Sequence, residues 1–355
     1  MFFGPDFDKR LSLLRDQLAE RPVSEEVRGW SYSQPPVRPP SPAALTVSEL
    51  AARYCDTLRD IYLHRVKRVE QPTTTKLVRG AVLHEVIRLT ISESKRYIYS
   101  YPSASGYDLI SKFAEEDMGQ LVSRALWAEG KRRKAGITAA GSGGDGGAAG
   151  TRPAAGVGRA SPGTSRGGYA PNPNGADLPP DLNEEELKGE AEDLHRYLLI
   201  SIASRLDDAR SRFPHAGEDS LVAAAVPSVS ERKVDGSLVG LSRELSVDLY
   251  TPYNAVIDVK TGEARDFHPL TAAGYALALE SEGQTAIDYG VITYLKMEGR
   301  RVPTVENRYF VVGDEVRREF LEVRDEAISV LETGKDPGKP DRCPSYCPYY
   351  AVCNP

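Results

Sequence analysis

Two short segments decide the fold, SVDLY at residues 246–250 and IDVKTG at residues 257–262. Each reads as a β-strand, and the turn-forming residues 251–254 separate them. Asp258 and Lys260 are two positions apart on one strand, so both side chains project to the same face. Asp248 lies ten residues before Asp258, across the turn. A hairpin would therefore bring the two carboxylates together.

Two carboxylates next to a lysine form an arrangement that can bind a metal ion and act on a phosphate group. Two carboxylates repel each other unless a cation lies between them, and oxygen ligands suit Mg²⁺ or Mn²⁺. A lysine can orient or deprotonate a water molecule and stabilise a developing phosphorane. The pattern is compatible with a metal-dependent phosphodiesterase. The alternative is a solvated charge pair on an exposed strand, because Asp-x-Lys also occurs by chance.

The surrounding sequence predicts a mixed α/β core, one sheet flanked by helices. Apolar spacing and turn signals predict helices at 6–21, from a capping box at Thr46 onward to Cys55, and at 81–97, 184–213, 268–280 and 314–331. Strand-like patterns cover 221–234, 238–250, 255–259, 286–295 and 304–312. His84 follows Gly80 as Gly-x-x-x-His, in the first turns of the helix at 81–97. It is either a core histidine or a ligand.

We divide the chain into five parts. These are an N-terminal helix with a Pro-rich segment (1–45), a helical part carrying Cys55 and His84 (46–134), a Gly/Ala-rich insertion (135–176), the catalytic core (184–335) and a Cys-rich tail (336–355). The insertion is expected to be disordered, because its composition buries too little apolar area to offset the entropy of ordering.

Overall composition limits the class of protein. The chain has 355 residues, 45 Lys+Arg and 51 Asp+Glu, for a formal net charge of −6. This charge disfavours a protein that coats nucleic acid non-specifically, though it allows a local basic cleft. No apolar run is long enough for a membrane span, and the first residues lack a secretory pattern, so the expected compartment is the cytoplasm.

The four cysteines, Cys55, Cys343, Cys347 and Cys353, suggest one shared site. Two disulfides would be unusual in a reducing compartment. A structural zinc site usually has two close cysteine pairs, whereas here three cysteines cluster and the fourth is remote. Three clustered thiolates with a distant fourth favour an iron–sulfur cluster, and zinc remains the alternative.

Residues 51–80 carry a local positive excess. Seven cations face three acids there: Arg53, Arg59, Arg65, Lys67, Arg68, Lys76 and Arg79 against Asp56, Asp60 and Glu70. Tyr54 and Tyr62 are interleaved among them. This is a candidate strand-binding surface, and the alternative is an ordinary solvated face. We interpret the other histidines, at 64, 195, 215 and 268, as surface or structural residues.

Taken in order, these residues resemble a known group. Cys55, Gly80-x-x-x-His84, Asp248, Asp258-x-Lys260, Tyr275 and the C-terminal cysteine cluster are similar to the motifs of the RecB-like iron–sulfur nucleases of the CRISPR adaptation machinery. Residues 59–63 and 78–85 look most like the archaeal branch associated with type I-A systems. The resemblance covers roughly 45–134 and 184–355.

The resemblance implies a restriction-endonuclease-like (PD-(D/E)xK) core with a [4Fe–4S] cluster on the four cysteines. It implies that His84, Asp248, Asp258 and the Val259 carbonyl hold Mg²⁺ or Mn²⁺. Lys260 would be the catalytic lysine, and Tyr275 would lie near the DNA backbone. The implied activity is exonucleolytic trimming of single-stranded DNA ends, which prepares prespacers for spacer acquisition. The implied partners are CRISPR integrase proteins, and a homo-oligomer is compatible with them.

The sequence also departs from that pattern. Thr271 stands where the family has the Gln of its Gln-x-x-x-Tyr motif, and Leu245 where a Gly often precedes the motif Asp. Asp258 replaces the more frequent Glu, and the first gap in the cysteine cluster is three residues rather than two. An alternative function is therefore a non-catalytic DNA-end-binding or assembly subunit. A nuclease module of a recombination helicase is a weaker alternative, because the chain has no phosphate-binding loop of its own.

Overall fold

The structure is a computed structural model that describes residues 6–72, 74–115, 179, 181–251, 253–297, 299 and 301–354. The predicted insertion at 135–176 lies outside these residues. The helices are α1 (Asp6–Glu20), α2 (Val47–Ala51), α3 (Arg59–Ile61), α4 (Thr75–Ser100), α5 (Gly106–Glu115), α7 (Glu184–Arg212), α8 (Glu218–Ala225), α9 (Pro269–Gly283), α10 (Asp314–Thr333) and α11 (Tyr350–Cys353). The strands are β1 (Val229–Val234), β2 (Leu245–Thr251), β3 (Ala255–Lys260), β4 (Tyr289–Lys296) and β5 (Thr304–Val311). Short 3-10 or π turns lie at Glu25–Val27, Gly29–Ser31, Tyr62–Val66 and Ser237–Val239.

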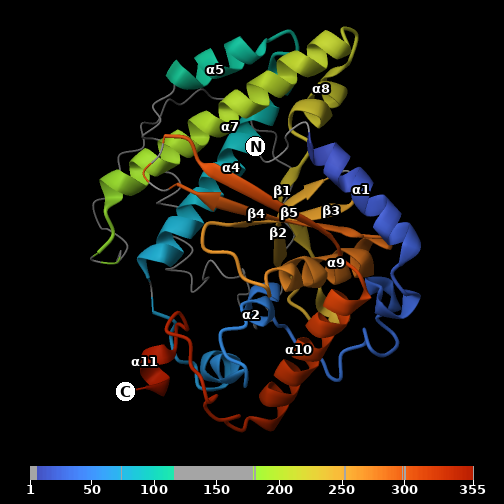
Figure 1. Cartoon of the computed structure of the whole chain (residues 1–355), viewed down its shortest axis with the longest axis vertical. Helices are drawn as coiled ribbons and strands as arrows, with labels where there is room; N and C mark the ends of the chain where they lie inside the picture. Colours follow the sequence, from blue (N-terminus) through green and yellow to red (C-terminus); the bar gives the residue numbers. More distant parts are fainter. Residues whose placement is uncertain are drawn as a thin grey trace, which may run out of the picture.

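One five-stranded sheet forms the centre of the molecule (Figure 1), with its strands in the order β1-β2-β3-β4-β5. The first three strands form an antiparallel meander, β3 and β4 are parallel, and β4 and β5 are antiparallel. Parallel neighbours need a crossover connection, and α9 is that connection. The β3–α9–β4 unit therefore places α9 directly against the strand that carries Asp258 and Lys260.

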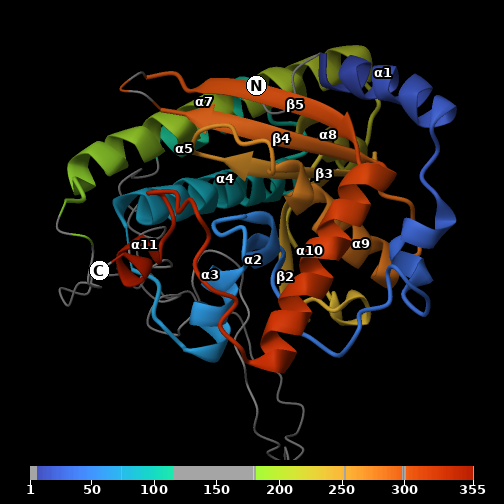
Figure 2. The same cartoon turned by 60° about the horizontal axis from the view of Figure 1, so that its bottom comes forward.

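Helices cover both faces of the sheet. On one face, α4, α5, α7 and α8 pack with Leu249, Ile257 and Val291 in one apolar cluster. On the other, α2, α9 and α10 pack with Val247 and Val256 in a second cluster. Figures 1 and 2 show these two helical layers with the sheet between them. Because β3 is covered on both sides, every residue from Ala255 to Val259 is buried, which explains why this segment is apolar except at Asp258.

Two of the predicted strands are shorter than the sequence suggests. The segment predicted as a strand from 221 begins instead with α8, and β1 starts only at Val229. The segment predicted from 238 begins with a short 3-10 turn, and β2 starts at Leu245. Apolar runs of this length fit a buried helix as well as a strand, so packing against the neighbouring helices decides between them.

Two helix boundaries also differ from the prediction. The capping box at Thr46 is confirmed, but α2 ends at Ala51, so Cys55 lies in the loop that follows. The helix that carries His84 begins at Thr75, with Thr74 as its N-cap, so Gly80 lies inside α4 rather than before it. The prediction missed this start because the glycine resembles a helix boundary. The predicted helices at 184–213, 268–280 and 314–331 are confirmed within a few residues.

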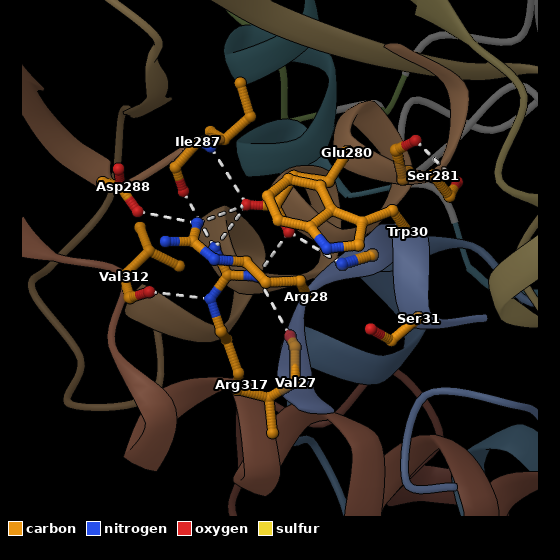
Figure 3. A network of polar contacts seen from close by, with 12 residues as sticks. Val27, Arg28, Trp30, Ser31, Glu280, Ser281, Ile287, Asp288, Val312 and Arg317 are labelled. Carbon is orange, nitrogen blue, oxygen red and sulfur yellow. Dashed lines mark hydrogen bonds and ion pairs between the residues drawn. The ribbon is translucent and has the colours of Figure 1, made fainter. Parts of the chain in front are cut away.

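A buried ionic network ties the N-terminal segment to α9 and α10 (Figure 3). The carboxylate of Glu280 accepts hydrogen bonds from both terminal nitrogens of Arg317, at 2.8 and 2.9 Å, and from Nη1 of Arg28 at 2.8 Å. The backbone N–H of Gly29 adds another bond of 2.8 Å. A Cβ at Gly29 would lie 2.0 Å from the Leu277 carbonyl oxygen, so only glycine lets the segment approach α9 so closely.

In the described part of the chain, no helix is both long and apolar enough to cross a membrane.

Candidate active site

The candidate site lies where β2 and β3 diverge. The two strands pair from Leu249↔Ile257 to Thr251↔Ala255, and beyond that point the carboxylate of Asp248 accepts the Val259 N–H at 3.0 Å. The Asp248 side chain thus accepts the hydrogen bond that a backbone carbonyl of β2 would accept in a regular strand pair. This opening at the end of the hairpin brings Asp248 and Asp258 into the same region, as the sequence predicts.

Asp258 and Lys260 project to the same face of β3, which confirms the prediction from their spacing. Lys260 Nζ lies 2.8 Å from Oδ2 of Asp258. The Asp258 carboxylate is almost fully buried, and its Oδ2 makes no hydrogen bond within the described residues beyond this ion pair. Burial alone would lower the pKa of Lys260, but the negative charges of Asp258 and Asp248 outweigh it and raise this pKa. The lysine is therefore held as a cation.

His84 reaches the site from α4. Its Nδ1 lies 3.5 Å from Oδ2 of Asp248. Gly80 lies one turn earlier, and a Cβ added there would come within 3.2 Å of Oγ1 of Thr261, which follows β3. The glycine thus lets α4 pack close to the end of β3. This explains the Gly-x-x-x-His spacing in physical terms and favours a site residue over an ordinary core histidine.

The carboxylate of Asp248 is electrostatically perturbed. Its pKa is raised to about 6, mainly by burial and also by the negative charge of Asp258. Tyr275 on α9 is affected by the same two carboxylates. Burial raises its pKa well above the usual value, and the charges of Asp248 and Asp258 raise it further. The structure therefore brings together Asp248, Asp258, Lys260, His84 and Tyr275.

Thr271 is 5% exposed and lies one turn before Tyr275 on α9. A buried threonine is shorter than glutamine and cannot extend an amide toward a ligand at the surface. Leu245 on β2 is the second residue that departs from the family pattern. It is buried in the apolar cluster that α2, α9 and α10 form with the sheet. Both departures therefore have a packing role in this chain.

Two residues near the site were not predicted from the sequence to lie there. His268 was interpreted as surface or structural, yet its pKa is influenced by Lys260 and Asp258 as well as by burial. Tyr54 was placed on a strand-binding surface, and it lies close enough to Lys260 for the charge of the lysine to influence its pKa. The position of His268 at the start of α9, seven residues before Tyr275, is a helical spacing that could have revealed it.

The donor set suits a divalent metal ion by its chemistry. Two carboxylates are ligands that suit Mg²⁺ or Mn²⁺, and an imidazole, supplied here by α4, is a common ligand of transition-metal ions. As the side chains stand, no three His, Cys, Asp or Glu residues in the described ranges are spaced to hold a metal ion. Metal binding would therefore require the side chains to close around the ion.

The four cysteine residues lie close enough to one another to interact electrostatically. Cys347 packs with Tyr62, Leu63 and Tyr349 in a small cluster, against which Cys353 also packs. All four cysteines are free thiols, so the disulfide alternative has no support in the structure. The pKa of Cys347 is raised to about 11, mainly by burial and in part by its neighbours Cys343 and Cys55, which also help to raise the pKa of Cys353. The four thiols therefore lie near one another.

The predicted strand-binding surface at 51–80 is only partly supported. Four of its seven cations are paired with carboxylates: Arg53 with Glu319, Arg59 with Asp336, Arg65 with Glu49 and Arg79 with Glu190. Tyr62 is 4% exposed, so its ring cannot stack on a base, and this part of the prediction is wrong. The exposed cations that remain are Lys67, Arg68 and Lys76.

Fold and site together define an α/β protein with a carboxylate–lysine–histidine cluster at the open end of a β-hairpin. Comparison with known proteins then gives the family. The profile of the family described as CRISPR-associated exonuclease Csa1 matches residues 1–132 and 175–355, and the chain belongs to this family. The unmatched residues, 133–174, fall almost entirely within the predicted insertion.

Two relatives agree with this assignment. The CRISPR-associated exonuclease Csa1 of Saccharolobus solfataricus is 31% identical over 356 residues, which span 100% of both chains. That of Thermoproteus tenax is 30% identical over 341 residues, which span 93% of this chain and 91% of the relative. No solved structure matches the chain. The resemblance to CRISPR-associated nucleases is thereby confirmed.

Proposed function

We propose that the protein is a metal-dependent DNA exonuclease with an iron–sulfur cluster, which trims single-stranded DNA ends for spacer acquisition. The observation that carries the proposal is the convergence of Asp248, Asp258, Lys260 and His84 at the end of the β2–β3 hairpin. Two meeting carboxylates cost electrostatic energy, and a structural role would not need them. The meander, crossover helix and following hairpin also fit the expected restriction-endonuclease-like core.

Asp248, Asp258 and His84, with the Val259 carbonyl, would hold Mg²⁺ or Mn²⁺. When bound, the ion would activate a water and neutralise charge on the phosphodiester. Lys260 remains a cation beside Asp258, so it would stabilise negative charge at the phosphate rather than remove a proton. The Val259 N–H fixes the Asp248 carboxylate by a bond of 3.0 Å. Tyr275 stays protonated and can donate a hydrogen bond to the DNA backbone.

The four cysteines would hold the iron–sulfur cluster. They combine one thiol from the loop after α2 with three from the tail, and two of them, Cys347 and Cys353, pack with buried tyrosines and a leucine. Thiolate ligands of this number suit a [4Fe–4S] cluster. The cluster would join two segments that are far apart in the sequence.

Replacement of Lys260 tests the proposal directly. Anaerobically purified wild type, Lys260→Ala and Lys233→Ala would be incubated with end-labelled single-stranded DNA and Mn²⁺. Lys233 is exposed on β1 and serves as the matched control. We expect wild type and the control to shorten the strand, and Lys260→Ala to lose roughly a hundredfold or more in rate, because a charged group at the reacting phosphate contributes an effect of this size.

Each other outcome has a definite meaning. Equal cleavage by Lys260→Ala and wild type would contradict the assignment of the site. If no chain cleaves any strand while wild type binds DNA ends, the protein is the assembly subunit, or it requires the integrase proteins for activity. Adding those proteins to the same reaction separates these two cases.

A further inference from the structure

A second polar cluster lies beside Lys260 and is outside the nuclease motifs. It consists of His268, Arg265 and Arg308, arranged around Tyr294, and we call it the His268 cluster. Lys260 and Tyr294 are direct partners in the β3–β4 pairing, and the Tyr294 hydroxyl lies 3.0 Å from Nδ1 of His268. The Arg308 guanidinium lies over the Tyr294 ring, 5.1 Å from its centre. The cluster therefore continues the active-site face of the sheet.

His268 is arranged as a neutral hydrogen-bond donor. Its Nδ1 faces the hydroxyl of Tyr294 and accepts the backbone N–H of Arg265 at 3.4 Å. Nδ1 is thus the acceptor, and the proton lies on Nε2, which has no hydrogen-bond partner among the described residues. Burial is the main cause that lowers the pKa of His268 to about 4, and the positive charge of Lys260 contributes to this value. The imidazole is therefore neutral near pH 7.

The arginines of the cluster are only weakly neutralised. Arg265 contacts Glu263 at 3.4 Å and Arg308 contacts Glu306 at 3.4 Å. Both of these carboxylates are mostly exposed to solvent, so the pairs contribute little. Positive charge thus prevails around His268, and an additional anion would be attracted there.

The helix geometry relates this cluster to Tyr275. His268, Thr271 and Tyr275 are spaced by three and then four residues, so they lie along one face of the helix. Thr271 is buried, whereas His268, one turn earlier, is partly exposed and offers a free N–H. The hydroxyl of Thr271 is a donor but is buried, so the imidazole N–H of His268 is the more accessible donor on this face of the helix.

We propose that His268, Arg265 and Arg308 form a subsite for a backbone phosphate of the DNA strand, next to the phosphodiester held at Asp258 and Lys260. The subsite rests on the proposed function. Guanidinium groups and an uncharged N–H donor are suited to a phosphodiester oxygen. Because these groups contact the backbone and no base, the subsite would position the strand without reading its sequence.

Binding measurements on the full chain test the subsite independently of cleavage. A fluorescent single strand would be titrated in the presence of a chelator, so that it stays intact, at several salt concentrations. The variants are His268→Ala, His268→Gln and Arg308→Ala. The controls are His215→Ala and Arg243→Ala, which replace exposed residues of the same types.

We expect Arg308→Ala and His268→Ala to weaken binding by roughly tenfold each. Arg308→Ala should also reduce the slope of log affinity against log salt by about 0.7, whereas His268→Ala should leave it unchanged because the imidazole is neutral. His268→Gln, which restores an N–H donor, should bind nearly as wild type does. On a strand whose linkages are uncharged methylphosphonates, wild type and Arg308→Ala should bind equally.

The subsite would be contradicted if both alanine variants bound with wild-type affinity. It would also be contradicted if the variants lost equal affinity for charged and uncharged strands, or if the wild type bound no single strand. Different results contradict the subsite and the proposed exonuclease. If the wild type cleaves DNA while the His268 and Arg308 variants bind normally, only the subsite is contradicted. If the wild type binds DNA through these residues but never cleaves it, only the exonuclease activity is contradicted.

Discussion

Burial and neighbouring charges shift the pKa values of the ionisable side chains at the candidate site in different directions. Asp248 has a pKa raised to about 6, while Lys260, only a few ångströms from a second carboxylate, is held in its charged form. His268, beside Lys260, is held neutral. One small region therefore combines a titratable carboxylate, a fixed cation and an uncharged donor, as a site for a phosphodiester would require.

His195 is a structural histidine, in agreement with its interpretation from the sequence. It is 1% exposed on α7, its Nδ1 lies 2.7 Å from Oγ1 of Thr90, and its Nε2 is buried without a partner in the described residues. Its pKa is lowered to about 4, mainly by burial and in part by the charge of Arg196. A second proton on this imidazole would be buried and unpaired.

This histidine predicts a pH dependence of stability. Its folded pKa lies below its unfolded value of about 6.5, so its contribution is present above pH 6.5 and is lost as the pH falls toward 4. Between about pH 7 and about pH 5, the free energy of unfolding should fall by about 2 kcal/mol more in wild type than in His195→Gln. Urea denaturation of both proteins at the two pH values measures this, and parallel losses would contradict it.

At the scale of elements, α9 organises the site. It crosses from β3 to β4, places Tyr275 near the carboxylates and His268 near Lys260, and is buried along almost its whole length. Its far end carries Glu280, whose carboxylate is fully buried between Arg28 and Arg317 (Figure 3). Burial alone would raise the pKa of Glu280, but the charge and hydrogen bonds of Arg317 outweigh it, and this pKa is lowered. The network thus fixes α9 against the N-terminal segment and α10.

Glu280→Ala should therefore be strongly destabilising. The change leaves the fully buried Arg317 without its counter-charge, and breaking such a pair typically costs about 3–5 kcal/mol. The control is Glu332→Ala, at an exposed position near the end of α10, with an expected change within about 0.5 kcal/mol. Chemical denaturation measures both, and a loss for Glu280→Ala no larger than that of the control would show that the network has no stabilising role.

At the scale of the whole molecule, the C-terminal tail returns to the segment between α2 and α4. Figure 2 shows α11 and the chain before it beside α3. Tyr346 in the tail packs against Tyr54 at 6.4 Å and lies beneath the guanidinium of Arg265 at 4.5 Å. Tyr54 interacts with Lys260, and Arg265 belongs to the His268 cluster. The cysteine region is therefore in contact with the edge of the candidate active site.

Replacing one cysteine tests the proposed iron–sulfur cluster. Cys353→Ser should lower the iron bound per chain and reduce the melting temperature by roughly 5 °C or more, because a cluster that joins two segments stabilises the folded state. Ser345→Ala, at an exposed tail position, should change neither quantity. Metal analysis with thermal denaturation gives both readouts. Zinc instead of iron in wild type would support the zinc alternative, and no bound metal would contradict the cluster.

Particular elements show how far the sequence predicts this fold. The strand carrying Asp258 and the helices α7, α9 and α10 follow from local periodicity, because each is long or evenly patterned enough to exclude the alternative structure. The segments before β1 and β2 do not, since a short apolar run fits either state and packing decides it. Thr75 as the start of α4 was also hidden, because a glycine within a helix resembles a boundary until close packing explains it.

The sequence by itself determined the residue types and local spacings of the site: the Asp-x-Lys pair on one strand face, Gly80 before His84, and the cysteines in the tail. These depend on short-range geometry, which is the same in every helix and strand. Only the tertiary structure decided that His268 and Tyr54 lie beside Lys260, that Tyr62 is buried, and that Glu280 joins three segments of the chain. Such contacts unite residues far apart in the sequence, and packing and desolvation select them only when the whole chain is folded.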